Sequence, residues 1–153
     1  QSWIFRFVSI LGNRYTHGHV YDFYKQLKSD PTSLYILGNG KQRKSYLHVD
    51  DCIEAILLAI NNAKEKVNIF NLGVDDYCEV NDSIDWICGE LQLSPSFEYS
   101  GGEKGWIGDN PFIYLDTQRI MKLGWKPKYT IKEGVIKTVQ FLKENEWVFE
   151  ERE

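Results

Sequence analysis

The sequence predicts an α/β fold, in which strands and helices alternate along the chain. Residues 3–11 (WIFRFVSIL) and 67–72 (VNIFNL) are nearly continuous runs of apolar, β-favouring residues, as in strands buried on both faces of a parallel sheet. Between them, residues 50–62 have apolar residues at the i, i+3, i+4 and i+7 spacing of a core-facing helix: Ile53, Ile56, Leu57 and Ile60. Alternation of this kind is typical of an α/β domain.

Shorter sequence patterns predict the other helices and strands in the first two thirds of the chain. Gly12-Asn13-Arg14 ends the first strand, and the apolar residues within 20–27 predict a helix after a loop. A short strand is expected over residues 34–37, directly before a glycine-flanked turn, Gly38-Asn39-Gly40. Residues 80–91 have the apolar spacing of a further helix.

In the last third of the chain, the sequence indicates the starts of helices more clearly than it indicates strands. Residues 97–99 predict a short strand, followed by a glycine-rich loop over 100–111. Asp116 is expected to cap a short helix that runs through Met121. Thr130 and Glu133 form a capping box, which starts a final amphipathic helix. The acidic tail after residue 144 is expected to fray.

Length and composition predict one domain over residues 1–153 and exclude some partners. The 22 acidic residues outnumber 18 Lys and Arg, giving a net charge of −4, so the chain lacks the basic face that nucleic-acid binding needs. No apolar run approaches the ~20 residues of a membrane span. Three cysteines without C-x-x-C spacing predict a reducing, cytoplasmic location. The chain begins directly on an apolar run, so we expect it to be part of a longer protein.

Several pattern matches do not carry chemistry. Tyr21-x-x-x-Lys25 has the spacing of a hydride-transfer Tyr/Lys pair, but it directly follows a loop in the wrong chain context. His17, His19 and Asp22 could bind a metal, yet the spacing is weak and polar loop contacts are the better interpretation. The glycines from Gly102 to Gly108 follow only a weak apolar run, and Asp109-Asn110-Pro111 stands where a dinucleotide-binding loop requires a helix. We therefore predict neither a catalytic residue nor a metal site.

The turn after residue 37 concentrates positive charge. Lys41, Arg43 and Lys44 follow the glycines, and Arg or Lys can donate charge-assisted hydrogen bonds to an anion. A distant cation, Lys104, lies in the glycine-rich loop beside Trp106. Two cationic loops with aromatic residues would suit a phosphorylated ligand with a planar or sugar part. On spacing alone, the alternative that these cations are solvated surface charges is equally open.

A series of short blocks, in order, makes the chain resemble a known family. The blocks are Arg6-Phe7, Gly12-Asn13-Arg14, residues 37–51 (LGNGKQRKSYLHVDD), Asn71-Leu72-Gly73, residues 105–109 (GWIGD), Asp116 and residues 123–127 (LGWKP). Together they resemble the C-terminal half of an NAD-dependent epimerase/dehydratase, an extended short-chain dehydrogenase/reductase, and most of all the UDP-glucose 4-epimerase-like members. The resemblance covers this whole chain but about half of the family's usual chain.

The resemblance implies a Rossmann-type fold and a divided function. The strands near 3–11 and 67–72 would be the last strands of the Rossmann sheet, and the NAD-binding half would lie before Gln1. NAD would be bound mainly by that half, which would also hold the catalytic tyrosine and lysine. This chain would therefore be the substrate-binding half of an epimerase and inactive alone. Alternatives are a nucleotide-sugar dehydratase or reductase, or a non-catalytic interaction module; the full-length protein could form a homodimer.

The resemblance also implies residues that contact a UDP-sugar or related nucleotide sugar. Lys44 occupies the place of an arginine that grips the diphosphate; lysine keeps the charge without the bidentate fork, and Arg43 lies beside it. Ser9 replaces an asparagine that faces the substrate. Lys104, or the position of Trp106, falls where another arginine meets the phosphates.

The remaining implied contacts come from the first strand and the loop after it. Phe7 and Val8 would run beneath the nicotinamide of NAD. Val20, with His17 in the same segment, would lie near the base or the sugar. Asp50, Asp51 and Asp116 would be structural.

Overall fold

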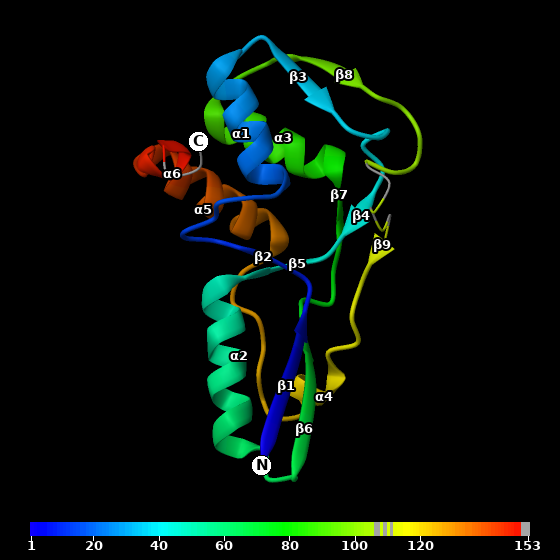
Figure 1. Ribbon diagram of the computed structural model, residues 1–153, viewed down its shortest axis with the longest axis vertical. Helices are drawn as coiled ribbons and strands as arrows, with labels where there is room; N and C mark the ends of the chain where they lie inside the picture. Colours follow the sequence, from blue (N-terminus) through cyan, green and yellow to red (C-terminus); the bar gives the residue numbers. More distant parts are fainter. Residues whose placement is uncertain (106–107, 109, 111, 151–153) are drawn as a thin grey trace.

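The computed structural model describes residues 1–105, 108, 110 and 112–150, which form an elongated α/β molecule of two parts (Figure 1). The strands are β1 Ser2–Phe7, β2 Ser9–Leu11, β3 Ser33–Ile36, β4 Arg43–Lys44, β5 Tyr46–His48, β6 Val67–Leu72, β7 Cys78–Glu79, β8 Ser96–Tyr99 and β9 Phe112–Ile113. The helices are α1 His19–Ser29, α2 Val49–Asn62, α3 Val80–Leu91, α4 Gln118–Met121, α5 Ile131–Glu144 and α6 Trp147–Glu150.

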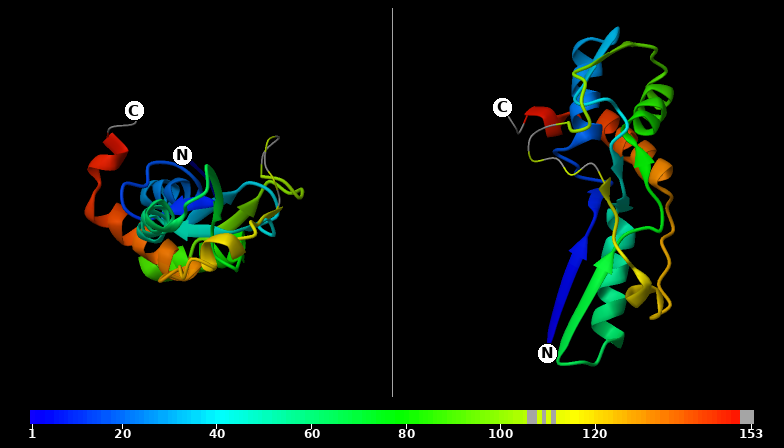
Figure 2. Two further views of the ribbon diagram at one scale, coloured as in Figure 1. Left: turned by 90° about the horizontal axis from the view of Figure 1, so that it is seen from below. Right: turned by 90° about the vertical axis from the view of Figure 1, so that its right-hand side faces the viewer.

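The first part is built on two parallel strands. β1 pairs with β6 from Ser2↔Val67 to Phe7↔Leu72, and the two strands lie side by side with α2 running alongside them (Figures 1 and 2). The expected strand over residues 3–11 is interrupted at Val8, which is buried. Beyond it, β2 leaves β6 and pairs in parallel with β5 instead. The single strand predicted there was therefore wrong, because the chain changes partner at that residue.

The expected orientation of α2 was also wrong. Three of its predicted core residues are 41–55% exposed: Ile53, Leu57 and Ile60. The face that packs against the rest of the chain carries small residues, namely Cys52, Ala55 and Ala59. These small side chains let α2 pack close to β2 and β5, whereas the larger apolar side chains remain uncovered in this chain. None of the described helices has the length and apolar character needed to cross a membrane.

The second part is a layer of three helices around a shared core. α1, α3 and α5 lie together above the strands (Figure 1), and their inward residues have at most 2% exposure: Val20, Leu27, Ile84, Ile87, Val135, Val139 and Leu142. The predicted capping box of α5 is present, since Thr130 Oγ1 accepts from the Glu133 amide at 3.2 Å. Of the tail that was expected to fray, residues 147–150 form the short helix α6, where Val148 is buried and Phe149 stacks on Tyr21; residues 151–153 lie outside the described residues.

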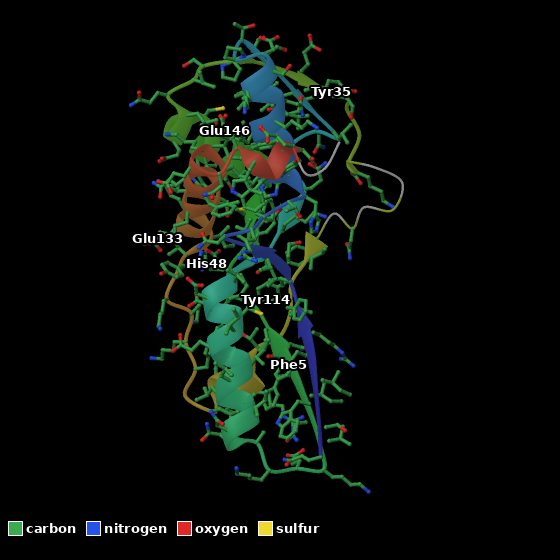
Figure 3. The ribbon with its side chains drawn as sticks, turned by 60° about the vertical axis from the view of Figure 1, so that its left-hand side comes forward. Phe5, Tyr35, His48, Tyr114, Glu133 and Glu146 are labelled. Atoms are coloured by element: carbon green, nitrogen blue, oxygen red, sulfur yellow. The ribbon has the colours of Figure 1, made fainter. Side chains whose placement is uncertain are left out.

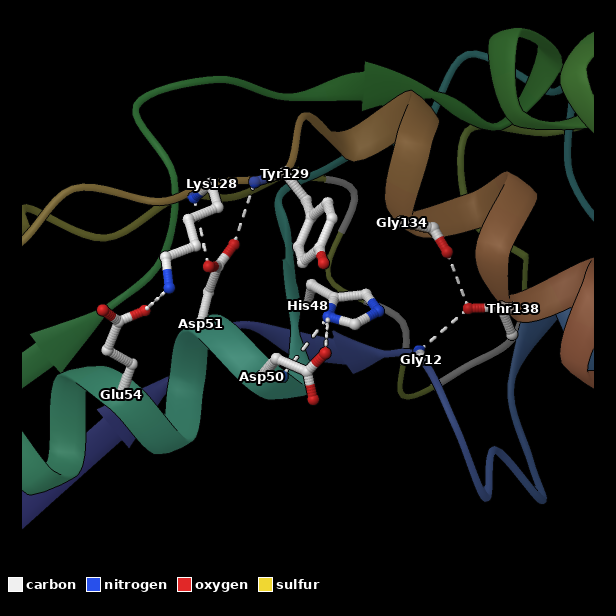
Figure 4. Close-up of polar contacts among 9 residues, drawn as sticks. All are labelled: Gly12, His48, Asp50, Asp51, Glu54, Lys128, Tyr129, Gly134 and Thr138. Atoms are coloured by element: carbon white, nitrogen blue, oxygen red, sulfur yellow. Dashed lines mark hydrogen bonds and ion pairs between the residues drawn. The ribbon is translucent and has the colours of Figure 1, made fainter.

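Buried polar contacts join the two parts (Figure 4). Asp51, fully buried in the first turn of α2, accepts from the backbone amides of Lys128 and Tyr129, both at 3.1 Å. His48 lies at the start of α2, at the junction between the parts (Figure 3), where its Nδ1 accepts from the Asp50 amide at 3.3 Å. These contacts fit the structural role expected of Asp51 and hold the start of α2, directly after β5 and the cationic turn that precedes it.

The short helix α4 begins later than expected. Its N-cap is Thr117 rather than Asp116. The Asp116 carboxylate nevertheless accepts from the Gln118 amide at 2.9 Å, so it binds an amide of the first turn that would otherwise lack an acceptor.

Candidate functional site

A cavity of about 470 Å³ opens between the start of α1, the strands β4 and β5 and the start of α3. Its wall includes His19, Phe23, Lys44 and Tyr46. A volume of this size lies within the range of roughly 300–1,000 Å³ found for small-molecule sites. The lining combines aromatic side chains with one lysine, the carboxylate of Asp22 and several hydrogen-bonding groups, which is the composition expected of a site for a polar organic ligand.

The tight turn before β4 holds the strand against α3. Gly38 and Gly40 have φ of +84° and +76°, in the left-handed region that favours glycine. A Cβ atom at Gly38 would collide with the Gln42 side-chain amide. The carbonyls of Gly40 and Gln42 accept from the Asn81 and Val80 amides at 3.0 and 3.1 Å, at the start of α3. The glycine turn therefore fixes where β4 presents its two cations.

The two cations of β4 face opposite sides, because side chains alternate along a strand. Lys44 lines the cavity, and its Nζ donates to the Asn110 carbonyl. Arg43 lies in a separate cleft of about 410 Å³, with its guanidinium 5.6 Å from the centre of the Tyr77 ring. The cations of the turn, which were predicted to bind an anion together, therefore lie in two different places. Of the two in β4, only Lys44 lines the cavity.

Tyr46 faces the cavity two residues after Lys44, in a polar chain with His19. The Tyr46 hydroxyl lies 3.1 Å from His19 Nδ1, and His19 Nε2 lies 2.7 Å from the Ser83 hydroxyl. The rings of His19 and Tyr46 are 4.9 Å apart. Burial of the imidazole and the nearby Lys44 lower the His19 pKa to about 4. The imidazole is therefore neutral at physiological pH and leaves Lys44 as the cation of this wall.

The structure separates most of the other predicted substrate contacts from the cavity. His17 is exposed and stacks on Tyr15, with ring centres 6.1 Å apart. Val20 is fully buried in the helix core and does not line the cavity. Ser9 and Lys104 are exposed and do not line it either. Trp106 lies outside the described residues.

The two predicted NAD contacts lie at the end of β1 and differ in exposure. Phe7 is 54% exposed, whereas Val8 is 3% exposed beneath it. Val8 packs near Gly73, where an added Cβ would lie 3.3 Å from a Val8 methyl group. Phe7 alone of the two is on the surface, and neither residue lines the cavity that contains Lys44.

Sequence reasoning missed His19, Phe23 and Tyr46 as cavity residues. A signal was present: His19 and Phe23 are four residues apart on one face of α1, and Lys44 and Tyr46 are two apart on an extended segment. His19 was considered as a metal ligand and interpreted instead as a residue making polar loop contacts. Among the residues described, no group of three or more His, Cys, Asp or Glu is placed to hold a metal ion.

Comparisons with known proteins agree with the resemblance seen in the sequence. Residues 2–73 match the model of the NAD dependent epimerase/dehydratase family. A putative UDP-glucose 4-epimerase of Methanocaldococcus jannaschii is 34% identical over 121 residues, which are 79% of this chain and 37% of that protein. A trifunctional UDP-glucose 4,6-dehydratase, epimerase and reductase of Arabidopsis thaliana is 30% identical, over 73% of this chain and 17% of that protein.

Solved structures show the same relation in the fold. A UDP-galactose 4-epimerase superimposes with a TM-score of 0.81 at 32% identity, over 95% of this chain and 46% of that one. A dTDP-glucose 4,6-dehydratase from Bacillus anthracis in complex with NAD has the same TM-score at 20% identity, which shows the fold alone. The α/β fold class and the family resemblance are confirmed, and the chain spans less than half the length of these relatives.

Proposed function

We propose that this chain, which resembles the NAD-dependent epimerase/dehydratase family in sequence and fold, is the nucleotide-sugar-binding portion of a UDP-glucose 4-epimerase-like enzyme. One observation carries the proposal. The cavity of about 470 Å³ places Lys44 beside Tyr46 and His19, in a chain 32% identical to a UDP-galactose 4-epimerase over almost its whole length.

The cavity suits a nucleoside diphosphate. Lys44 supplies a positive charge for the phosphates, and a lysine acts there as a point charge rather than as a bidentate fork. Phe23 and Leu37 add apolar wall for a planar base or a ribose. Gln26 is less available, because its amide already donates to the Tyr35 carbonyl and accepts from the Tyr35 amide, at 3.3 and 3.1 Å.

The rest of the predicted site would be completed by a second half that binds NAD. In the described residues β1 pairs only with β6, so one edge of each strand is unpaired. A parallel sheet is also normally covered on both faces. Phe7 and Ile4 on β1 are 54% and 45% exposed. We propose that β1 and β6 belong to a larger Rossmann sheet whose NAD-binding part covers this surface, beside Phe7, Val8 and Ser9. Lys104 and Trp106 would approach the phosphates from the glycine-rich loop.

This assignment places the chemistry outside the chain. The proposed role of the described residues is to bind and orient the nucleotide sugar, while NAD accepts and returns a hydride in the complete enzyme. The chain alone would be inactive. The complete enzyme would be cytoplasmic and could be a homodimer.

A nucleotide-sugar dehydratase is the second candidate. It is favoured by the 30% identity to the trifunctional dehydratase and to a dTDP-D-glucose 4,6-dehydratase of Mus musculus, over 73% and 72% of this chain. Both candidates use the same cavity and differ in chemistry. A reductase or a non-catalytic interaction module remain further alternatives.

The test separates binding from catalysis. Isothermal titration calorimetry of the chain with UDP-glucose, dTDP-glucose and GDP-mannose should show the tightest binding for UDP-glucose. A preference for dTDP-glucose would favour the dehydratase instead. In the presence of NAD and UDP-glucose, NMR of the products should show no turnover. Failure of all three ligands to bind would refute the proposal.

A further inference from the structure

The strand β3 has one edge that no other described strand covers, since β3 pairs with β8 alone among them. The Thr32 and Ile36 carbonyls face β8, because each accepts from a backbone amide at one end of that strand, both at 2.9 Å. Backbone groups of successive residues point to opposite edges of a strand. The N–H and C=O of Tyr35 therefore point to the other edge, which faces α1.

The side chain of Gln26, on α1, covers this edge. Its Nε2 donates to the Tyr35 carbonyl at 3.3 Å, and its Oε1 accepts from the Tyr35 amide at 3.1 Å. Both hydrogen bonds are exposed to solvent, and both residues line the cavity. The Gln26 amide therefore takes the place of a neighbouring strand, where a ligand of the cavity can reach it.

A carboxamide presents one acceptor and one donor side by side. Uracil and thymine present the same pair, because their C4 carbonyl adjoins the N3–H group of the ring. A base of this kind can therefore make with Tyr35 the two hydrogen bonds that Gln26 makes. Phe23 and Leu37, which line the same cavity, supply apolar contacts for the faces of the ring.

The charges of the cavity wall also favour a base at this edge. The Asp22 carboxylate lines the cavity one helical turn before Gln26. It repels a diphosphate, whereas a neutral base can lie beside it. Lys44, to which the proposed function assigns the phosphates, lines the cavity from β4. The nucleotide would then lie with its base against α1 and β3 and its phosphates toward β4.

We propose that Gln26 is a specificity-determining residue, whose amide covers the Tyr35 edge until a uracil or thymine base takes its place. This inference rests on the proposed function and names a residue that tunes it. Two hydrogen bonds to Tyr35 are exchanged for two others, and the released amide turns to water. A ring without an N–H beside its carbonyl cannot make both bonds, so it leaves Gln26 in place.

Two rival roles for Gln26 predict different results. If its side chain hydrogen-bonds the ligand directly, its removal weakens UDP binding. If it only braces α1 against β3, its removal weakens every ligand of the cavity alike. Displacement alone predicts that a variant without the amide binds UDP more tightly than the wild type does.

The experiment measures binding to Gln26→Leu by isothermal titration calorimetry, with UDP and with 3-methyl-UDP, in which a methyl group replaces the N3 hydrogen. If the amide covers the edge about 90% of the time, its removal raises UDP affinity about tenfold, since only the uncovered fraction binds the base. Affinity for 3-methyl-UDP should change less than about twofold. Gln140→Leu is the matched control, because its amide donates to Glu90 at 3.2 Å and does not line the cavity; its UDP affinity should equal that of the wild type.

NMR of the Gln26 side-chain amide provides a second measurement. Addition of UDP to the wild-type chain should move the signals of its Nε2 hydrogens to those of a solvated amide, whereas pyrophosphate, which has no base, should not. An unchanged or lower UDP affinity in Gln26→Leu, an equal rise for 3-methyl-UDP, or amide signals that UDP does not move would overturn the role of Gln26 and leave the proposed function standing. Absence of UDP binding by the wild-type chain would remove both. If Gln26→Leu does not fold, the NMR measurement decides.

Discussion

Replacing Asp51 with asparagine should strongly destabilise the chain. The carboxylate is fully buried and accepts from the Lys128 and Tyr129 amides, both at 3.1 Å (Figure 4). These bonds hold the segment before α5 against the start of α2. Asparagine has nearly the same shape, so Asp51→Asn tests the hydrogen bonds and the charge rather than the packing.

The magnitude follows from what the amide loses. Its oxygen can still accept from one backbone amide, but its NH2 group faces the other donor and leaves that donor unsatisfied. A buried unsatisfied group costs about 1–3 kcal/mol, and the remaining bond loses the extra strength given by the charge, about 1 kcal/mol. We therefore expect Asp51→Asn to lower the free energy of unfolding by about 2–4 kcal/mol, a large share of the stability of a small domain.

Urea denaturation followed by circular dichroism measures this loss. With a slope of about 2 kcal/mol per molar urea, typical of a small domain, the midpoint should fall by roughly 1–2 M. Asp50→Asn is the matched control, because that side chain is 62% exposed, and its effect should stay below about 1 kcal/mol. Equal midpoints for Asp51→Asn and the wild type would refute the role assigned to the buried carboxylate.

Three further outcomes are expected. Thr138→Val should lower the free energy of unfolding by about 1–3 kcal/mol, because Thr138 Oγ1 accepts from the buried Gly12 amide at 2.9 Å; Thr138→Ser, with its hydroxyl kept, should lose less in the same urea assay. The free energy of unfolding should decrease as the pH falls from about 6.5 to 4. The His19 pKa of about 4 is below its unfolded value, so the unfolded chain binds a proton that the folded chain does not. The unfolding temperature of His19→Gln should depend less on pH than that of the wild type, and an equal pH dependence would contradict this. Leu57→Glu should leave the unfolding midpoint nearly unchanged, because Leu57 is 55% exposed, whereas Ala55→Glu on the buried face should unfold the chain.

Local signals predicted those elements whose cause is local. The capping box at Thr130 and Glu133 starts α5 as expected, because its hydrogen bonds join residues three apart. The apolar run of residues 67–72 forms β6 with the same bounds. In both cases the residues that specify the element lie within it.

Elements that depend on distant partners were predicted less well. Val8 interrupts the first strand because β2 pairs with β5 instead of β6, and nothing within residues 3–11 specifies that change. The periodicity of α2 correctly defined an apolar face through Ile53 and Leu57 but could not say which partner it meets. Here the partner side of the helix is the small-residue face with Ala55.

The candidate site was predicted in part. Lys44 was identified from the cationic turn, and its cavity-facing position follows from the alternation that turns Arg43 the other way. His19, Tyr46 and Ser83 could not be assembled from the sequence, since His19 and Ser83 are 64 residues apart. Their contact exists only once α1 and α3 pack together.

The most direct test of the account is UDP binding by Lys44→Ala. Lys44 lines the cavity, whereas Lys41 lies in the separate cleft with Arg43, so Lys41→Ala is a control with the same loss of charge. Loss of a charge-assisted hydrogen bond of about 1.5–3 kcal/mol predicts that UDP affinity falls at least tenfold in Lys44→Ala. In Lys41→Ala it should change less than about twofold, as expected for an exposed charge. Equal affinities of wild type and Lys44→Ala, by calorimetry at one ionic strength, would contradict the placement of the phosphates in this cavity.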